Sequence, residues 1–135
     1  MLKNRLIPIL FLKDNFLVRS EKFDLHQRLG NPVAQVERYN DWNVDELIYL
    51  DISKGKHSIP SNKLNSSLFD NIYEGKNIIE YVSGKCFMPL TFGGGIRTLN
   101  DAEKCFFYGA DKISINYQAI KSPDFIGELA RNFGS

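Results

Sequence analysis

The fold of this chain is constrained most by one segment, residues 88–116, with the sequence MPLTFGGGIRTLNDAEKCFFYGADKISIN. An apolar run in this segment stops at three glycines, and Thr98 or Asn100 can then cap a helix. Gly109 has the position of a helix-terminating glycine, and residues 112–115 follow as a second apolar run. The pattern predicts a strand, a helix and a further strand, which is the repeating unit of a parallel α/β sheet.

The three glycines between the predicted strand and helix are also a candidate anion site. Their backbone N–H groups can turn toward a phosphate without a Cβ in the way, and the N-terminus of the following helix is positive. The same run is equally typical of a tight turn. Asn116 favours the phosphate interpretation, because it follows the next strand and ligand groups gather at that carboxyl rim. Asp51, which ends another apolar predicted strand, either binds substrate at this rim or caps a neighbouring loop.

The composition of the 135 residues is that of an ordinary globular protein, with 43% hydrophobic and 24% charged residues. A formal net charge of +1 gives no reason to expect nucleic acid or a membrane surface as a partner. Two cysteines, Cys86 and Cys105, make no disulfide framework, and no Cys/His cluster has the spacing of a metal site. No apolar run is long enough to cross a membrane. We therefore expect a cytoplasmic protein that uses neither a metal nor another cofactor.

Strand and helix patterns alternate four times along the chain. The predicted strands cover residues 6–12, 47–52, 89–92 and 112–115, and the predicted helices cover residues 32–42, 69–82, 98–108 and 122–132. This alternation predicts an α/β fold with a parallel sheet, right-handed crossovers and helices on the outer face. A complete (β/α)₈ TIM barrel takes about 250 residues. We therefore expect residues 1–135 to form one half-barrel, whose open sheet pairs with a C-terminal half-barrel or a second copy.

Two connections of this predicted half-barrel are unusual. The first strand has the composition of a strand buried on both faces, but Pro8 places it at a sheet edge or places the proline at the strand's start. Residues 13–15 interrupt its apolar run and residues 16–19 resume it, which predicts a hairpin-like excursion before a polar stretch around a solvated His26. Residues 53–67 form a long polar connection without a period, which we expect to cross the carboxyl rim.

Several segments resemble the cyclase subunit of imidazole glycerol phosphate synthase. They are RLIPILFLKDNFLVRS near the start, VDELIYLDI at the second strand, FGGGIRTLNDAEKCFFYGADKISIN in the central unit and ARNFGS at the end. The resemblance covers nearly the whole chain, apart from the connection after Asp51. It implies a (β/α)₈ barrel that receives ammonia from a glutaminase subunit. The family uses that ammonia on a substrate with two phosphates, and forms imidazole glycerol phosphate and an aminoimidazole carboxamide ribotide.

The resemblance also implies roles for individual residues. The phosphate site of this half of the barrel corresponds to Gly94, Gly95 and Asn116. A charged ring at the amino-terminal mouth, through which ammonia enters, corresponds to Arg5, Glu46 and Lys112. Such a ring can equally be a set of stabilising ion pairs. Arg19 corresponds to a basic residue in the family's mobile first loop, and Asp51 corresponds to an acid that faces the substrate.

The family's first catalytic aspartate has no counterpart here, because its position is occupied by Phe11, which cannot act as a general acid or base. The second belongs to a fifth strand, outside this chain. Normal cyclase turnover is therefore not expected of this polypeptide. The first strand also resembles that of cyclase-like barrels encoded with bacterial surface-polysaccharide genes. That resemblance implies ammonia conduction for the amidation of a surface sugar, and a non-catalytic half-barrel scaffold is a further interpretation.

Overall fold

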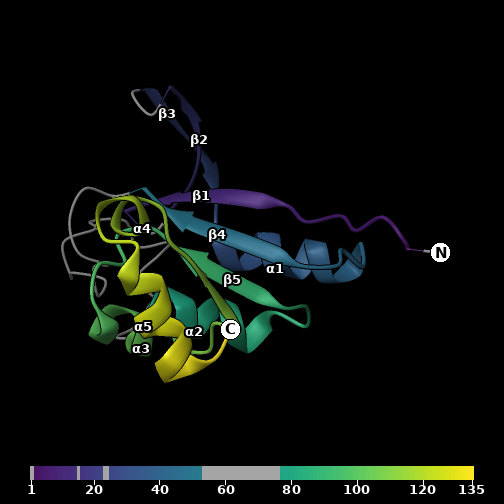
Figure 1. Cartoon of the computed structure of the whole chain (residues 1–135). Coiled ribbons are helices and arrows are strands. Elements are labelled where there is room, and N and C mark those ends of the chain that lie inside the picture. Colours follow the sequence, from purple (N-terminus) through teal and green to yellow (C-terminus); the bar gives the residue numbers. More distant parts are fainter. Residues whose placement is uncertain (1, 15, 23–24, 53–76) are drawn as a thin grey trace.

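The computed structural model describes residues 2–14, 16–22, 25–52 and 77–135, which form one six-stranded sheet with helices packed against it. The strand order is β3-β2-β1-β4-β5-β6 (Figure 1). The strands are β1 (Ile9–Lys13), β2 (Phe16–Glu21), β3 (Leu25–Gly30), β4 (Leu47–Asp51), β5 (Leu90–Gly93) and β6 (Lys112–Ser114). The helices are α1 (Pro32–Asp41), α2 (Ile78–Lys85), α3 (Leu99–Phe107), α4 (Tyr117–Lys121) and α5 (Asp124–Phe133).

Four of the strands, β1, β4, β5 and β6, are parallel neighbours in that order, and a helix precedes each of the last three. The predicted parallel sheet of strand and helix units is therefore confirmed. Pro8 lies directly before β1, where its missing N–H removes no ladder hydrogen bond. Its carbonyl accepts a 3.0 Å hydrogen bond from the N–H of Ile48. The proline thus has the start-of-strand position that the sequence allowed.

The hydrophobic core lies between the helices and one face of the sheet. Leu47 and Tyr49 of β4 are 0% exposed, and they belong to one cluster with apolar residues of α1, α2, α3 and α5. The Tyr49 hydroxyl donates a 2.7 Å hydrogen bond to the carbonyl of Pro32, the first residue of α1. The hydroxyl of this buried phenol therefore keeps a hydrogen-bond partner.

The other face of the sheet is less covered. Ile9 of β1 is 54% exposed, and of the five residues of β1 only Leu12 is buried. The prediction that the first strand is buried on both faces is therefore wrong, because Ile9 lies on the face away from the helices. This uncovered face agrees with the expectation of a half-barrel, in which the inner face of the sheet lacks its second half.

The excursion after β1 is a complete antiparallel hairpin. β2 pairs with both β1 and β3, and the hairpin stands away from the helices (Figure 1). The residues of β3, LHQRLG, are too polar to give a strand pattern, so the sequence predicted only a polar stretch there. Pairing with β2 overrides this weak preference, and Cζ of Arg28 lies 4.0 Å from the ring centroid of Phe16 across the hairpin.

Two helices also differ from their predictions. The short α4 was not predicted, because its five residues are too few to show a helical period. α2 overlaps only the end of the helix predicted over residues 69–82 and continues to Lys85. The long connection over residues 53–67 and the start of that predicted helix lie outside the described residues. No helix in the described part of the chain is long and apolar enough to cross a membrane.

Candidate functional site

A cavity of about 280 Å³ lies at the carboxyl ends of the parallel strands. It is lined by Phe11, Leu50, Asp51, Ile52, Gly94, Gly95, Ile96, Arg97, Ser114, Ile115, Asn116 and Tyr117. Parallel α/β folds bind their ligands at this end of the sheet. The cavity is therefore the candidate site, and it brings together five of the residues singled out in the sequence: Phe11, Asp51, Gly94, Gly95 and Asn116.

The register of the parallel strands arranges the uncovered face of the sheet in rows. Paired residues of neighbouring strands share one face, and every second residue along a strand points to the same side. The row at the carboxyl end consists of Phe11, Leu50, Gly93 and Ser114. The row before it consists of Ile9, Ile48, Thr91 and Lys112. The first row borders the cavity, and the second row lies between the cavity and the amino-terminal end of the sheet.

The glycine turn after β5 has a backbone that side chains rarely allow. The φ angle is +100° at Gly94 and +69° at Gly95, both in the left-handed region. A Cβ on Gly94 would overlap the backbone of Asp51. A Cβ on Gly93 would lie 2.7 Å from the Cβ of Ser114. The turn therefore packs tightly against the ends of two neighbouring strands, and its backbone lines the cavity.

The first turn of α3 is capped by its own side chains. The hydroxyl of Thr98 accepts a 3.2 Å hydrogen bond from the N–H of Asp101, and the Asp101 carboxylate accepts 3.1 Å hydrogen bonds from the N–H groups of Thr98 and Arg97. This capping box makes Thr98, not Asn100, the N-cap. Because Asp101 brings a negative charge to this end of α3, the helix adds less positive potential to the cavity than the sequence suggested.

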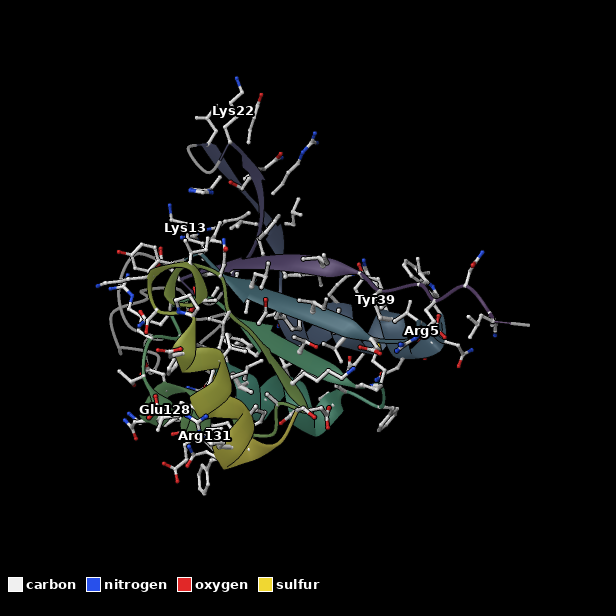
Figure 2. The ribbon with its side chains drawn as sticks, in the orientation of Figure 1. Arg5, Lys13, Lys22, Tyr39, Glu128 and Arg131 are labelled. Carbon is white, nitrogen blue, oxygen red and sulfur yellow. The ribbon has the colours of Figure 1, made fainter. Side chains whose placement is uncertain are left out.

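At the opposite end of the sheet, three charged side chains form a cluster, which we call the Glu46 cluster. Glu46 precedes β4 and its side chain is only 7% exposed. One of its carboxylate oxygens pairs with the guanidinium of Arg5, and the other lies 3.1 Å from Nζ of Lys112. Figure 2 shows Arg5 at the far end of the sheet from Lys13, the last residue of β1. The structure therefore brings together the three residues of the predicted ring.

Two predicted site residues differ in their relation to the cavity. Arg19 does not line it, because it lies in β2 opposite Gln27 and borders a separate open depression on the hairpin. Asp51 supplies the only carboxylate among the described residues that line the cavity. Phe11 also lines it, at the position where the family resemblance implies an acid. The side chain of Phe11 is apolar and carries no proton-transfer group.

Three polar or charged residues of the cavity were not predicted from the sequence: Arg97, Ser114 and Tyr117. Arg97 lies two residues after the glycine turn, and Tyr117 directly follows Asn116. Both therefore adjoin features that the sequence did identify. That adjacency was the available signal, but a sequence does not show which way a side chain points from a turn.

The two cysteines lie outside the cavity lining. Burial, together with the charge of Asp101, raises the pKa of Cys105 to about 11. Burial also raises the pKa of Cys86, whose thiol donates a 3.2 Å hydrogen bond to the Met88 carbonyl. Neither side chain is therefore a thiolate near neutral pH, which is the nucleophilic form. Within the described ranges, no group of three or more His, Cys, Asp or Glu residues could hold a metal ion.

Comparison with known proteins places this architecture in a family. The family of histidine biosynthesis proteins matches residues 5–135. The whole chain is 43% identical to a Campylobacter jejuni protein and 40% identical to a Pseudomonas aeruginosa protein, and covers 49% of each. Both are named, provisionally, imidazole glycerol phosphate synthase subunit hisF2.

A third relative is the imidazole glycerol phosphate synthase subunit HisF of Staphylococcus saprophyticus. It is 37% identical over 134 residues, which are 99% of this chain and 48% of the relative. The chain thus spans about half the length of the curated relatives it matches, and it corresponds to their N-terminal half. With its parallel strands, its carboxyl-end cavity and this family match, the chain belongs to the histidine biosynthesis protein family, whose fold is the TIM barrel.

Proposed function

We propose that this chain forms the N-terminal half of a cyclase-type subunit in a glutamine-dependent imidazole glycerol phosphate synthase system. In this proposal the cavity binds a phosphorylated substrate, and the opposite end of the sheet receives ammonia from a glutaminase subunit. The observation that carries the proposal is the position of the Glu46 cluster and the cavity at opposite ends of the same parallel strands. A subunit that takes up ammonia at one end and uses it at the other has this arrangement.

The phosphate site in this proposal consists of Gly94, Gly95 and Asn116. The left-handed backbone of the two glycines lets successive N–H groups point toward one anion. Asn116 lines the same cavity from the turn after β6, and its amide can donate to a phosphate oxygen. Asp51 also lines the cavity, with its backbone against Gly94, and its carboxylate can contact the polar groups of the substrate.

The route for ammonia in this proposal follows the uncovered face of the sheet. Glu46 lies before β4, and the row with Ile9, Ile48 and Thr91 separates it from the cavity row. Rows on one strand face are about 7 Å apart, so the route is short. Ammonia is small and neutral, so it can pass apolar side chains that would exclude ions. The second half of the barrel, or a second copy, would close the route by covering this face.

A second candidate function is ammonia delivery for the amidation of a bacterial surface sugar. The specific observation that favours it is that Phe11, an apolar residue, lines the cavity at the position where the resemblance implies the family's acid. Delivery needs the Glu46 cluster and the route but no proton-transfer group in this half of the barrel. A scaffold that only binds a partner needs neither, so measurements on Glu46 and Phe11 separate these functions.

We expect Glu46→Gln to lower the rate of glutamine-dependent amination of the family substrate about tenfold. A hydrogen bond to a charged group contributes about 1.5–3 kcal/mol, and a loss of about 1.4 kcal/mol corresponds to a tenfold change. Ammonia-dependent amination should change by less than about twofold, because free ammonia can reach the cavity directly. Both rates are measured on the complete native polypeptide with its glutaminase.

Asp45→Asn is the matched control for this test. Asp45 also lies before β4, but its carboxylate accepts a 2.6 Å hydrogen bond from the N–H of Leu6. The control removes one negative charge at the same end of the sheet and leaves the Glu46 cluster in place. Equal rate ratios in the two variants and the unaltered protein would rule out ammonia entry at this cluster.

A further inference from the structure

We propose that Arg97, held against the ring of Tyr117, is an additional ligand of the phosphate at the glycine turn. This inference rests on the proposed function, since it adds a cationic side chain to the Gly94, Gly95 and Asn116 site. It also names the class of ligand that the site prefers, which is a phosphate monoester in its dianionic form.

The geometry places Arg97 and Tyr117 on the same cavity from two different turns. Arg97 follows the glycine turn after β5, and Tyr117 follows Asn116 after β6, and both line the cavity. Cζ of Arg97 lies 5.7 Å from the centroid of the Tyr117 ring, which is within the range of a cation–π contact. This contact favours a position of the exposed Arg97 guanidinium beside the ring.

The charges around the glycine turn show why an anion here needs this side chain. The N-terminus of α3, the helix that follows the glycine turn, already has the Asp101 carboxylate on the N–H groups of Arg97 and Thr98. Asp51 adds a further carboxylate to the cavity lining. Arg97 carries the only positive charge among the described residues that line the cavity. Without Arg97, only backbone N–H groups and the neutral Asn116 amide would offset the repulsion between a dianion at the turn and these two acids.

The chemistry of arginine then determines the ligand class. A planar guanidinium can donate two parallel hydrogen bonds to a phosphate, and such charge-assisted bonds are about twice as strong as neutral ones. A neutral sugar at the same place would leave Arg97 without an anionic partner. The site should therefore select phosphate esters over the corresponding free sugars.

Lys121 provides a matched control on the same aromatic ring. Its Nζ lies 6.0 Å from the ring centroid of Tyr117, but Lys121 does not line the cavity. Arg97→Gln and Lys121→Gln each remove one positive charge and one cation–π partner. Only the first removes a group that can reach the cavity.

The test is calorimetric titration of the complete native polypeptide with ribose 5-phosphate and with ribose, at about pH 8, where the phosphate is a dianion. We expect Arg97→Gln to weaken ribose 5-phosphate binding about tenfold or more and to reduce its salt dependence. Lys121→Gln should change the affinity by less than about twofold. Tyr117→Phe should keep the affinity, because it keeps the ring, whereas Tyr117→Leu should weaken binding a few-fold through loss of the platform.

The outcomes separate this inference from the proposed function. If the protein binds ribose 5-phosphate and Arg97→Gln and Lys121→Gln have equal small effects, Arg97 is not a ligand and the inference is wrong, while the phosphate site stands. If the unaltered protein binds ribose 5-phosphate no better than ribose, the phosphate site itself is wrong. If Tyr117→Leu and Tyr117→Phe bind equally, Tyr117 is not the platform for Arg97.

Discussion

Replacing Phe11 by aspartate is expected to raise ammonia-dependent turnover of the family substrate by about 10²-fold. A positioned general acid or base contributes about 10²–10⁴-fold, and the lower end applies because the surrounding cavity has not been shaped around an acid. Phe11 lines the cavity and pairs with Leu50 in the row at the carboxyl end of the sheet. A carboxylate on this residue would therefore point toward the proposed substrate. The measurement is steady-state product formation with ammonium salt as the nitrogen source.

Phe11→Asn is the control for this gain of activity. Asparagine has nearly the size and polarity of aspartate but cannot transfer a proton near neutral pH. An increase with Phe11→Asp alone would show that the cavity retains cyclase geometry. A folded Phe11→Asp variant that binds ribose 5-phosphate without any increase in turnover would instead favour ammonia delivery or a scaffold.

Gly94→Ala is expected to lower the free energy of unfolding by about 3 kcal/mol and to abolish ribose 5-phosphate binding. The left-handed backbone at φ +100° costs an alanine about 1–2 kcal/mol. The new Cβ would also overlap the backbone of Asp51, and relief of such an overlap costs about 1–3 kcal/mol. Because the backbone cannot move without displacing the turn, the N–H groups of the proposed phosphate site move with it. Urea denaturation gives the stability, and calorimetry gives the binding.

Gly84→Ala separates this local effect from the general effect of replacing a glycine. Gly84 lies in α2, and a Cβ there meets no atom within 4 Å. This variant is therefore expected to be as stable as the unaltered protein or up to about 1 kcal/mol more stable. A Gly94→Ala protein with unchanged stability and affinity would contradict the described conformation of the turn.

The parallel core of the fold could be predicted from the sequence because its pattern is strongly determined by burial. Strands β4 and β5 are short apolar runs between polar or glycine residues, and their predicted bounds agree with the structure to within a residue. The start of α3 was also predictable, since Thr98 has the side chain of an N-cap. These features depend on residues close together in the sequence.

Features that depend on distant partners could not be predicted in the same way. The polar β3 is a strand because β2 lies beside it, and the exposure of Ile9 depends on what covers the sheet. In the candidate site, the glycines and Asn116 were identifiable from residue type and position. The contact between Arg97 and Tyr117 was not, because it joins the turns of two different strands.

The two outer strands of the sheet, β3 and β6, offer very different templates to an added strand. β3 has six residues, but it includes Arg28 and ends in a glycine, which discourages unwanted pairing between molecules. β6 has only three residues and begins with Lys112, which is already paired with Glu46. A ladder of three residues fixes the register of a neighbour weakly. Assembly at β6 must therefore be directed by side chains, which makes this edge selective for its proper partner and a poor starting point for aggregation.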